Sequence, residues 1–172
     1  MLKVVSNAQV LRIHGMSNSQ NEEDVNIVNG IDKKHAIPVY HRLTYIQFNY
    51  MEYKKDWIAA VDLLKYCPKL EALVIEKRDV PFIWEDDGEI VNWLYPQSDS
   101  ECISSHLKIC TLKNYKGFKS EFQFAAYIMQ NARFLRTMKI CSTADHPWEK
   151  FRMLKELSSC TRCSKTCELS FE

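Results

Sequence analysis

The sequence has no run of about 18 apolar residues, so we expect no membrane-spanning helix. Its 23 basic and 22 acidic residues leave a net charge of only +1. This balance gives no bulk electrostatic reason for the chain to bind nucleic acid or an anionic membrane. Four glycines and five prolines are too few to suggest long disordered linkers, apart from two polar stretches at residues 17–32 and 85–100. These absences indicate an ordinary globular protein.

Catalytic signatures are also absent. The patterns G-x-x-x-x-G-K-[ST], G-x-G-x-x-G, G-x-S-x-G and H-E-x-x-H do not occur, and the five histidines are scattered over separate segments. We therefore expect no enzymatic activity and no cofactor. The opening stretch MLKVVSNAQVLRIHG lacks the long apolar core and cleavage site of a secretory signal. Seven cysteines without such a signal indicate reduced thiols in a cytoplasmic or nuclear protein.

Three cysteines near the end of the chain raise the question of a metal site. Cys160, Cys163 and Cys167 have C-x₂-C-x₃-C spacing, whereas a structural zinc site needs four ligands, usually in two pairs. A second pair is missing, and Cys141 and His146 are the nearest candidates in sequence. We interpret the three cysteines as core and loop thiols, because free cysteine packs like a small hydrophobic residue. A small cysteine-based metal-binding module remains the alternative.

One apolar pattern recurs five times: an apolar residue, two others, an apolar residue, one other, and a third apolar residue. The last two positions alternate as in a half-buried strand, so each triplet predicts a strand with a buried side. The triplets are Ala8, Leu11, Ile13; Leu43, Ile46, Phe48; Leu70, Leu73, Ile75; Leu107, Cys110, Leu112; and Leu135, Met138, Ile140.

Segments between the triplets have helical periodicity. Asp56 can cap a helix that ends before Pro68, with Trp57, Ile58, Val61, Leu64 and Cys67 on its apolar face. In the second expected helix, Ser120 and Gln123 have the spacing of a capping box, and Asn131 marks the expected end. The apolar stripe of this helix consists of Phe122, Ala125, Ile128 and Met129.

A third helix is expected to start near Pro147, with Trp148, Phe151, Leu154 and Leu157 on one face. Strand and helix thus alternate along the chain. The pattern predicts an α/β fold, a leucine-rich-repeat-like solenoid with parallel strands and outer helices. A generic α/β domain with a parallel sheet is the alternative.

Two stretches resemble a known family. The segment CPKLEAL, Cys67 to Leu73, is similar to the leucine-rich repeats of plant F-box proteins, and residues 102–140 resemble the FBD domain of many plant F-box/leucine-rich-repeat proteins. The matching positions of the FBD-like stretch are Cys102, Ser104, Ser105, Leu107, Lys108, Gly117, Glu121, Asn131, Ala132, Leu135, Met138, Lys139 and Ile140, and the closing stretch adds Arg162, Ser164 and Cys167. We therefore expect a partial leucine-rich-repeat region at 1–95 and an FBD-like α/β unit at 96–172.

The resemblance implies a protein-interaction role. Members of the family recognise targets for a ubiquitin ligase, and their F-box docks on a Skp1-type adaptor. No segment of this sequence resembles an F-box, so we do not expect it to bind that adaptor. A residual truncated product without any partner is a further alternative.

The repeated triplet also predicts which residues would meet a protein target. The residue between the second and third apolar positions, and the residue after the triplet, should face the concave side of the solenoid. The hypothetical partner-binding residues are Arg12, Gln47, Asn49, Val74, Glu76, Thr111, Lys113 and Lys139. They would equally suit ordinary exposed strand positions, because a fold alone does not give a function.

Overall fold

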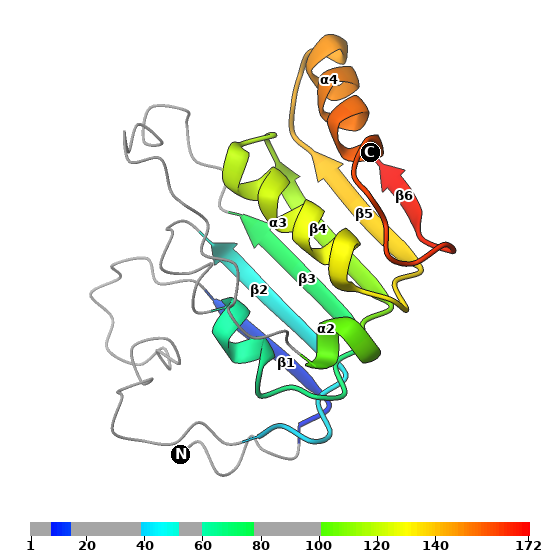
Figure 1. Ribbon diagram of the computed structural model, residues 1–172. Helices are drawn as coiled ribbons and strands as arrows, with labels where there is room; N and C mark the ends of the chain where they lie inside the picture. The colour runs from blue at the N-terminus through cyan, green and yellow to red at the C-terminus, as the bar shows by residue number, and fades with distance from the viewer. Residues whose placement is uncertain (1–7, 15–38, 52–59, 78–100) are drawn as a thin grey trace, which may run out of the picture.

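A computed structural model describes residues 8–14, 39–51, 60–77 and 101–172. Its centre is a six-stranded sheet whose strands lie in chain order, and every neighbouring pair is parallel (Figure 1). The strands are β1 (Val10–His14), β2 (Tyr45–Met51), β3 (Ala72–Lys77), β4 (Ile109–Tyr115), β5 (Thr137–Ser142) and β6 (Glu168–Phe171). This arrangement confirms the predicted α/β architecture of parallel repeats.

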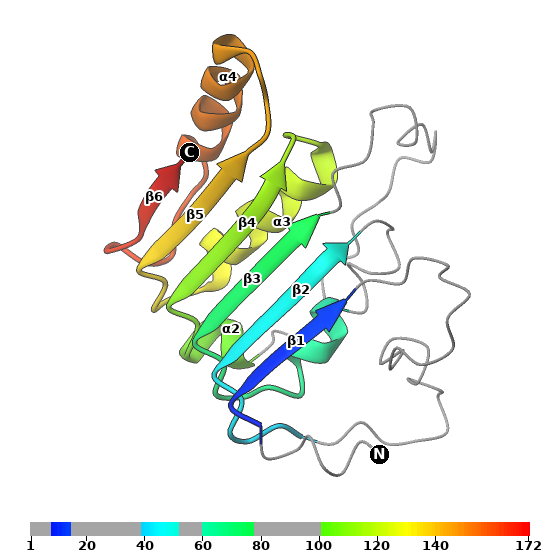
Figure 2. The same ribbon diagram turned by 180° about the vertical axis from the view of Figure 1, so that it is seen from behind.

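The helices of the described chain lie on one face of this sheet. They are α2 (Glu101–Ser105), α3 (Lys119–Asn131) and α4 (Pro147–Ser158), together with a helical segment at 60–64. Figure 2 shows the sheet from its other side, with these helices behind the strands. In the described part of the chain, that second face carries no helix. We call it the open face.

The predicted strand register is confirmed residue by residue. The second triplet positions Leu11, Ile46, Leu73, Cys110 and Met138 lie side by side across the first five strands, and so do the third positions Ile13, Phe48, Ile75, Leu112 and Ile140. All ten side chains are buried. Because successive strand residues point to opposite faces, their neighbours must lie on the open face. Leu169 and Phe171 of β6 extend the two rows and are partly buried.

A backbone ladder repeats at the start of each strand. The carbonyl of Gln9 accepts the N–H groups of Thr44 and Tyr45, and the carbonyl of Thr44 accepts those of the two corresponding residues in the next repeat. The carbonyls of Glu71 and Lys108 each accept two backbone N–H groups from the following repeat in the same way, with N···O distances of 2.8 to 3.2 Å. The fully buried residues Leu43, Leu70, Leu107 and Leu135 lie just before these points. The same turn therefore stacks on itself through successive repeats, as in a solenoid.

The first two predicted helices are partly confirmed. Val61, Leu64 and Cys67 are buried as expected, whereas Asp56, Trp57 and Ile58 lie outside the described residues. Helix α3 ends at Asn131 as predicted, and Ala125, Ile128 and Met129 are buried. Phe122 is only partly buried, and Phe124 takes its place in the core.

The predicted capping box of α3 was wrong. Phe118 is the N-cap residue, and the Glu121 side chain, rather than Ser120 or Gln123, bonds back to the helix start. Sequence spacing identified a capping box in the right region. It placed the cap two residues too late, because Phe118 is not a residue type that favours the N-cap position.

Helix α4 begins at Pro147 as predicted but presents a different side to the core. Met153 and Leu157 are buried, while Trp148 and Phe151 are 62% and 69% exposed. With 3.6 residues per turn, positions 148 and 151 lie roughly opposite positions 153 and 157. The expected apolar face of Trp148, Phe151, Leu154 and Leu157 therefore reaches the core only through Leu157. Leu154 lies on its border and is exposed.

Gly117 makes close packing possible between the turn after β4 and α4. Its φ is +79°, a region that favours glycine, and an added Cβ would lie 2.9 Å from Met153 Cγ. A side chain here would be strained and would clash with the residue that anchors α4. This explains in physical terms why a glycine suits this position of the FBD-like pattern.

Candidate protein-binding face

The predicted partner-binding residues lie in two rows across the open face. The first row is continuous: Arg12, Gln47, Val74, Thr111 and Lys139 occupy matching register positions on β1 to β5, and Ser170 of β6 continues it. Arg12 is exposed and the next four are half-buried. The structure thus brings together side chains that are up to 127 positions apart in sequence, from Arg12 to Lys139.

The second row is interrupted. His14 pairs with Asn49 in the β1–β2 register, and Glu76 pairs with Lys113 in the β3–β4 register. Between them the β2–β3 register shifts, after Phe48. Asn49 is 8% exposed, so it offers less surface to a partner than its position in the triplet suggested.

A third row, at the amino ends of the strands, was not among the sequence predictions. It holds Val10, Tyr45, Ala72, Ile109 and Thr137. Val10 and Ile109 are 54% and 44% exposed. Strand alternation could have identified these residues, because each lies two positions before a member of the first row. The open face therefore includes apolar as well as polar surface.

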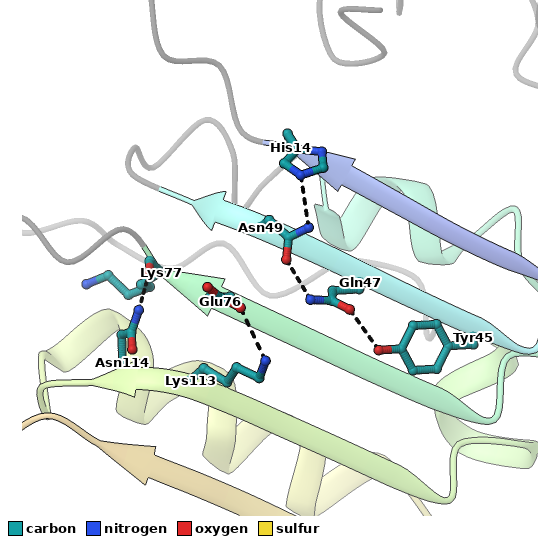
Figure 3. Close-up of polar contacts among 8 residues, drawn as sticks. All are labelled: His14, Tyr45, Gln47, Asn49, Glu76, Lys77, Lys113 and Asn114. Atoms are coloured by element: carbon teal, nitrogen blue, oxygen red, sulfur yellow. Dashed lines mark hydrogen bonds and ion pairs between the residues drawn. The ribbon is translucent and has the colours of Figure 1, made fainter. Parts of the chain in front are cut away.

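Several open-face side chains are held by hydrogen bonds to one another (Figure 3). Tyr45 Oη donates to Gln47 Oε1 at 2.9 Å, and Gln47 Nε2 donates to Asn49 Oδ1 at 2.6 Å. Asn49 Nδ2 then lies 3.4 Å from His14 Nε2. This series of hydrogen bonds runs along β2 and crosses to β1. It orients these side chains before any partner binds, which lowers the entropy lost on binding.

Two ion pairs occupy the other side of the face. Lys113 Nζ lies 3.3 Å from Glu76 Oε2, and Lys139 Nζ lies 2.8 Å from Glu172 Oε1. The hydrogen bond and charge of Glu172 raise the pKa of Lys139. Because these side chains are partly exposed to solvent, the pairs contribute little stability. Their chief effect is to hold lysine side chains over the open face.

Arg12 differs from the two lysines. Among the residues that the structure describes, no carboxylate forms an ion pair with its guanidinium. The planar guanidinium can bind a carboxylate through two parallel hydrogen bonds. Arg12 is therefore the residue of the first row best suited to an acidic group on a partner.

A buried ion pair fixes the carboxyl end of β3 to the start of α3. Lys77 Nζ lies 2.9 Å from Glu121 Oε1 and 4.6 Å from the centre of the Phe118 ring. Glu121 Oε2 accepts the backbone N–H groups of Lys116 and Phe118 at 3.0 and 2.9 Å. One carboxylate thus satisfies a buried cation and the end of a helix. Its position inside the protein indicates a structural role.

The cysteines do not assemble into a site. Burial raises the pKa of Cys67 and of Cys102 to about 12, and it raises the pKa of Cys110 further. These thiols stay protonated and pack as apolar groups. Of the predicted trio, Cys163 is exposed and Cys167 is buried. Across residues 8–14, 39–51, 60–77 and 101–172, no three His, Cys, Asp or Glu side chains form a group that could hold a metal ion.

No helix in the described part of the chain is both long and apolar enough to cross a membrane.

Part of the sequence also matches a known domain family. Residues 95–140 match the FBD family. The chain contains an FBD domain. The described part of this domain comprises α2, β4, α3 and β5 as far as Ile140, and its last three elements form a strand–helix–strand unit within the parallel sheet. The boundary predicted between 95 and 96 falls in residues that the structure does not describe, and the division of the chain into two domains stays a prediction.

Curated relatives extend the similarity beyond the FBD domain. The chain is 32% identical over 117 residues to the F-box/FBD/LRR-repeat protein At4g26340 of Arabidopsis thaliana, covering 67% of this chain and 28% of that protein. It is 35% identical over 124 residues to the probable FBD-associated F-box protein At5g38565 of the same plant, covering 72% and 34%. The chain is thus homologous to plant F-box/FBD/LRR proteins, and it spans about a third or less of their length. No solved structure matches it significantly.

Proposed function

We propose that the chain is a non-catalytic protein-interaction module whose open face binds a protein target. The observation that carries this proposal is the continuous row Arg12, Gln47, Val74, Thr111 and Lys139, which spans five strands with varied chemistry. Parallel repeat sheets commonly bind partners through such extended surfaces. Asn49, Glu76 and Lys113 border the row. Asn49 accepts a hydrogen bond from Gln47, and Glu76 and Lys113 pair with each other.

The relatives suggest the kind of target. Their names combine an F-box with FBD and LRR elements, and F-box proteins present targets to a ubiquitin ligase through a Skp1-type adaptor. We propose that the open face recognises a protein of this target class. In this proposal the chain itself supplies no adaptor contact and no covalent chemistry. It acts by occupying a surface of the target.

Site-specific photo-cross-linking tests this proposal. A photoreactive amino acid is placed at Thr111 or Val74 on the open face, and at Arg133 in the exposed connection before β5 as the matched control. We expect the two open-face positions to cross-link the same protein from a plant extract and the control position not to. Mass spectrometry then identifies that protein for purification.

Affinity measurements with the purified target complete the test. We expect Arg12→Ala and Lys139→Ala each to weaken binding by about five- to thirty-fold, as for interface side chains whose removal has a clear effect on affinity. Arg133→Ala should leave the affinity unchanged. Equal effects at all three positions, or no target cross-linked from the open face, would contradict the proposal and favour a chain without a partner.

A further inference from the structure

The outward side of α4 carries an exposed aromatic surface that the proposed function does not use. Trp148 and Phe151 are among the most exposed large apolar side chains of the described residues. The opposite side of the helix is anchored by Met153 and Leu157, which are buried. Since Met153 also packs against Gly117, α4 cannot easily rotate to bury its aromatic side. Solvent-exposed aromatic residues that a fold holds in place are typical of an interaction surface.

One cationic side chain continues the same stripe. Lys155 lies seven residues after Trp148 and four after Phe151, so all three share one side of the helix, over a length of about 10 Å. Lys155 is exposed, and no described carboxylate forms an ion pair with it. The amino-terminal half of this stripe is thus aromatic and its carboxy-terminal half is cationic. We call Trp148, Phe151 and Lys155 the α4 stripe.

The α4 stripe of one copy is complementary in chemistry to the α4 stripe of a second copy that runs in the opposite direction. If two copies pack antiparallel, the aromatic half of each faces the cationic half of the other. An ammonium group over the face of an aromatic ring is attracted by the ring's charge distribution, most strongly by tryptophan. A twofold axis makes every such contact occur twice.

We infer that α4 pairs with α4 of a second copy of this chain, in an antiparallel arrangement that places Lys155 of each copy on the aromatic rings of the other. The net charge of +1 produces little repulsion between copies. A purely acidic partner would engage Lys155 but would leave the two aromatic side chains without complementary groups.

The pairing is expected to be weak and to depend on concentration. Helix α4 has 12 residues, or a length of about 18 Å, so two such helices bury less surface than a standard stable interface of about 1,600 Å². Helix α4 also lies on the opposite side of the sheet from the open face (Figures 1 and 2). The open face therefore stays free, and the pairing does not depend on the proposed function.

Analytical ultracentrifugation of the full chain tests the inference. We expect the average mass to rise from monomer towards dimer as the protein concentration is raised from the micromolar to the millimolar range. Trp148→Ala and Phe151→Ala should each weaken the association at least about tenfold, and Lys155→Glu should weaken it as well because it removes the cation. Phe134→Ala, at an exposed aromatic residue outside α4, is the matched control and should leave the association unchanged.

These substitutions are at exposed positions, so the fold should survive, and circular dichroism checks this for each variant. A wild-type chain that stays monomeric at the highest concentration would overturn the inference. So would a dimer that persists unchanged in Trp148→Ala and Phe151→Ala, because it would use another surface. An equal loss in Phe134→Ala would also overturn it.

Discussion

Cysteine occupies two kinds of position in this chain. Cys67, Cys102 and Cys110 are buried, and Cys67 and Cys102 donate their S–H groups to the carbonyls of Leu63 and Leu64. Cys163 is exposed at the other extreme. Burial disfavours a thiolate because a charge is poorly solvated inside the protein. The buried thiols therefore make the stability of the fold depend on pH. The Cys163 side chain, by contrast, is exposed to solvent.

The free energy of unfolding should fall at alkaline pH. The pKa of Cys67 and of Cys102 is raised from 9.0 to about 12 in the folded chain. Above about pH 9 the unfolded chain loses these protons while the folded chain keeps them, so stability is full below pH 9 and is lost as the pH rises towards 12. Each thiol should contribute a slope of about 1.4 kcal/mol per pH unit in that window.

Urea unfolding at a series of pH values measures this slope. Cys102→Ala should make it shallower, and Cys163→Ala, at the exposed thiol, should not. An unchanged slope in Cys102→Ala would contradict a raised pKa of this thiol, because the contributions of separate groups to the slope add.

At the scale of a single element, the start of α3 depends on one buried carboxylate. Glu121 is 1% exposed, pairs with Lys77 and accepts two backbone N–H groups from the residues before the helix. These contacts link the end of β3 to the beginning of α3. Removing one partner of a buried ion pair leaves the other charge uncompensated, which costs far more than losing a surface pair.

Glu121→Gln should therefore destabilise the protein by about 3 to 5 kcal/mol, because it removes the buried carboxylate that lies 2.9 Å from the Lys77 ammonium group. The control is Asp62→Asn, which removes the exposed Lys65–Asp62 pair of 2.7 Å and should cost at most about 1 kcal/mol. Chemical denaturation of both variants measures the difference. Similar small losses in both variants would contradict a large contribution of the Lys77–Glu121 pair to stability.

At the scale of the whole molecule, the repeats form one continuous stack. The β3–β4 pair joins the two predicted regions 1–95 and 96–172, with matching residues from Ala72 to Glu76 and from Ile109 to Lys113. The backbone ladder also crosses this point, since Glu71 accepts the N–H groups of Lys108 and Ile109. Repeats coupled through such interfaces unfold together when the array is short.

We expect Leu43→Ala, a fully buried residue before β2, to destabilise strands on both sides of that junction. The loss should be about 2 to 5 kcal/mol, as for a large buried side chain cut back to alanine. Hydrogen exchange measured by mass spectrometry should show the same decrease of protection in β2 and in β5. A decrease confined to β1–β3 would instead reveal two units that unfold separately.

The sequence by itself determined the strands, their register and their buried sides. The repeated triplet was sufficient because a strand between a helix layer and solvent must alternate apolar and polar residues, and a slip by one residue would expose the whole core. It also identified the open-face row from Arg12 to Lys139, which follows from the same alternation. The FBD resemblance was confirmed by the family match at 95–140.

Only the tertiary structure decided which side of α4 is buried, which carboxylate begins α3, and how far Asn49 is exposed. Periodicity shows that residues such as Trp148 and Phe151 share a side of a helix, but the neighbours that pack against it select the buried side. The cap at Glu121 was missed because Phe118 is an unusual N-cap residue, and the ion pair of Glu121 was missed because Lys77 lies 44 positions away. Asn49 is more buried than its triplet position suggested, and it lies where the β2–β3 register shifts, a feature that depends on both strands. Apart from the local cap of α3, these features depend on contacts between distant segments, which no local pattern encodes.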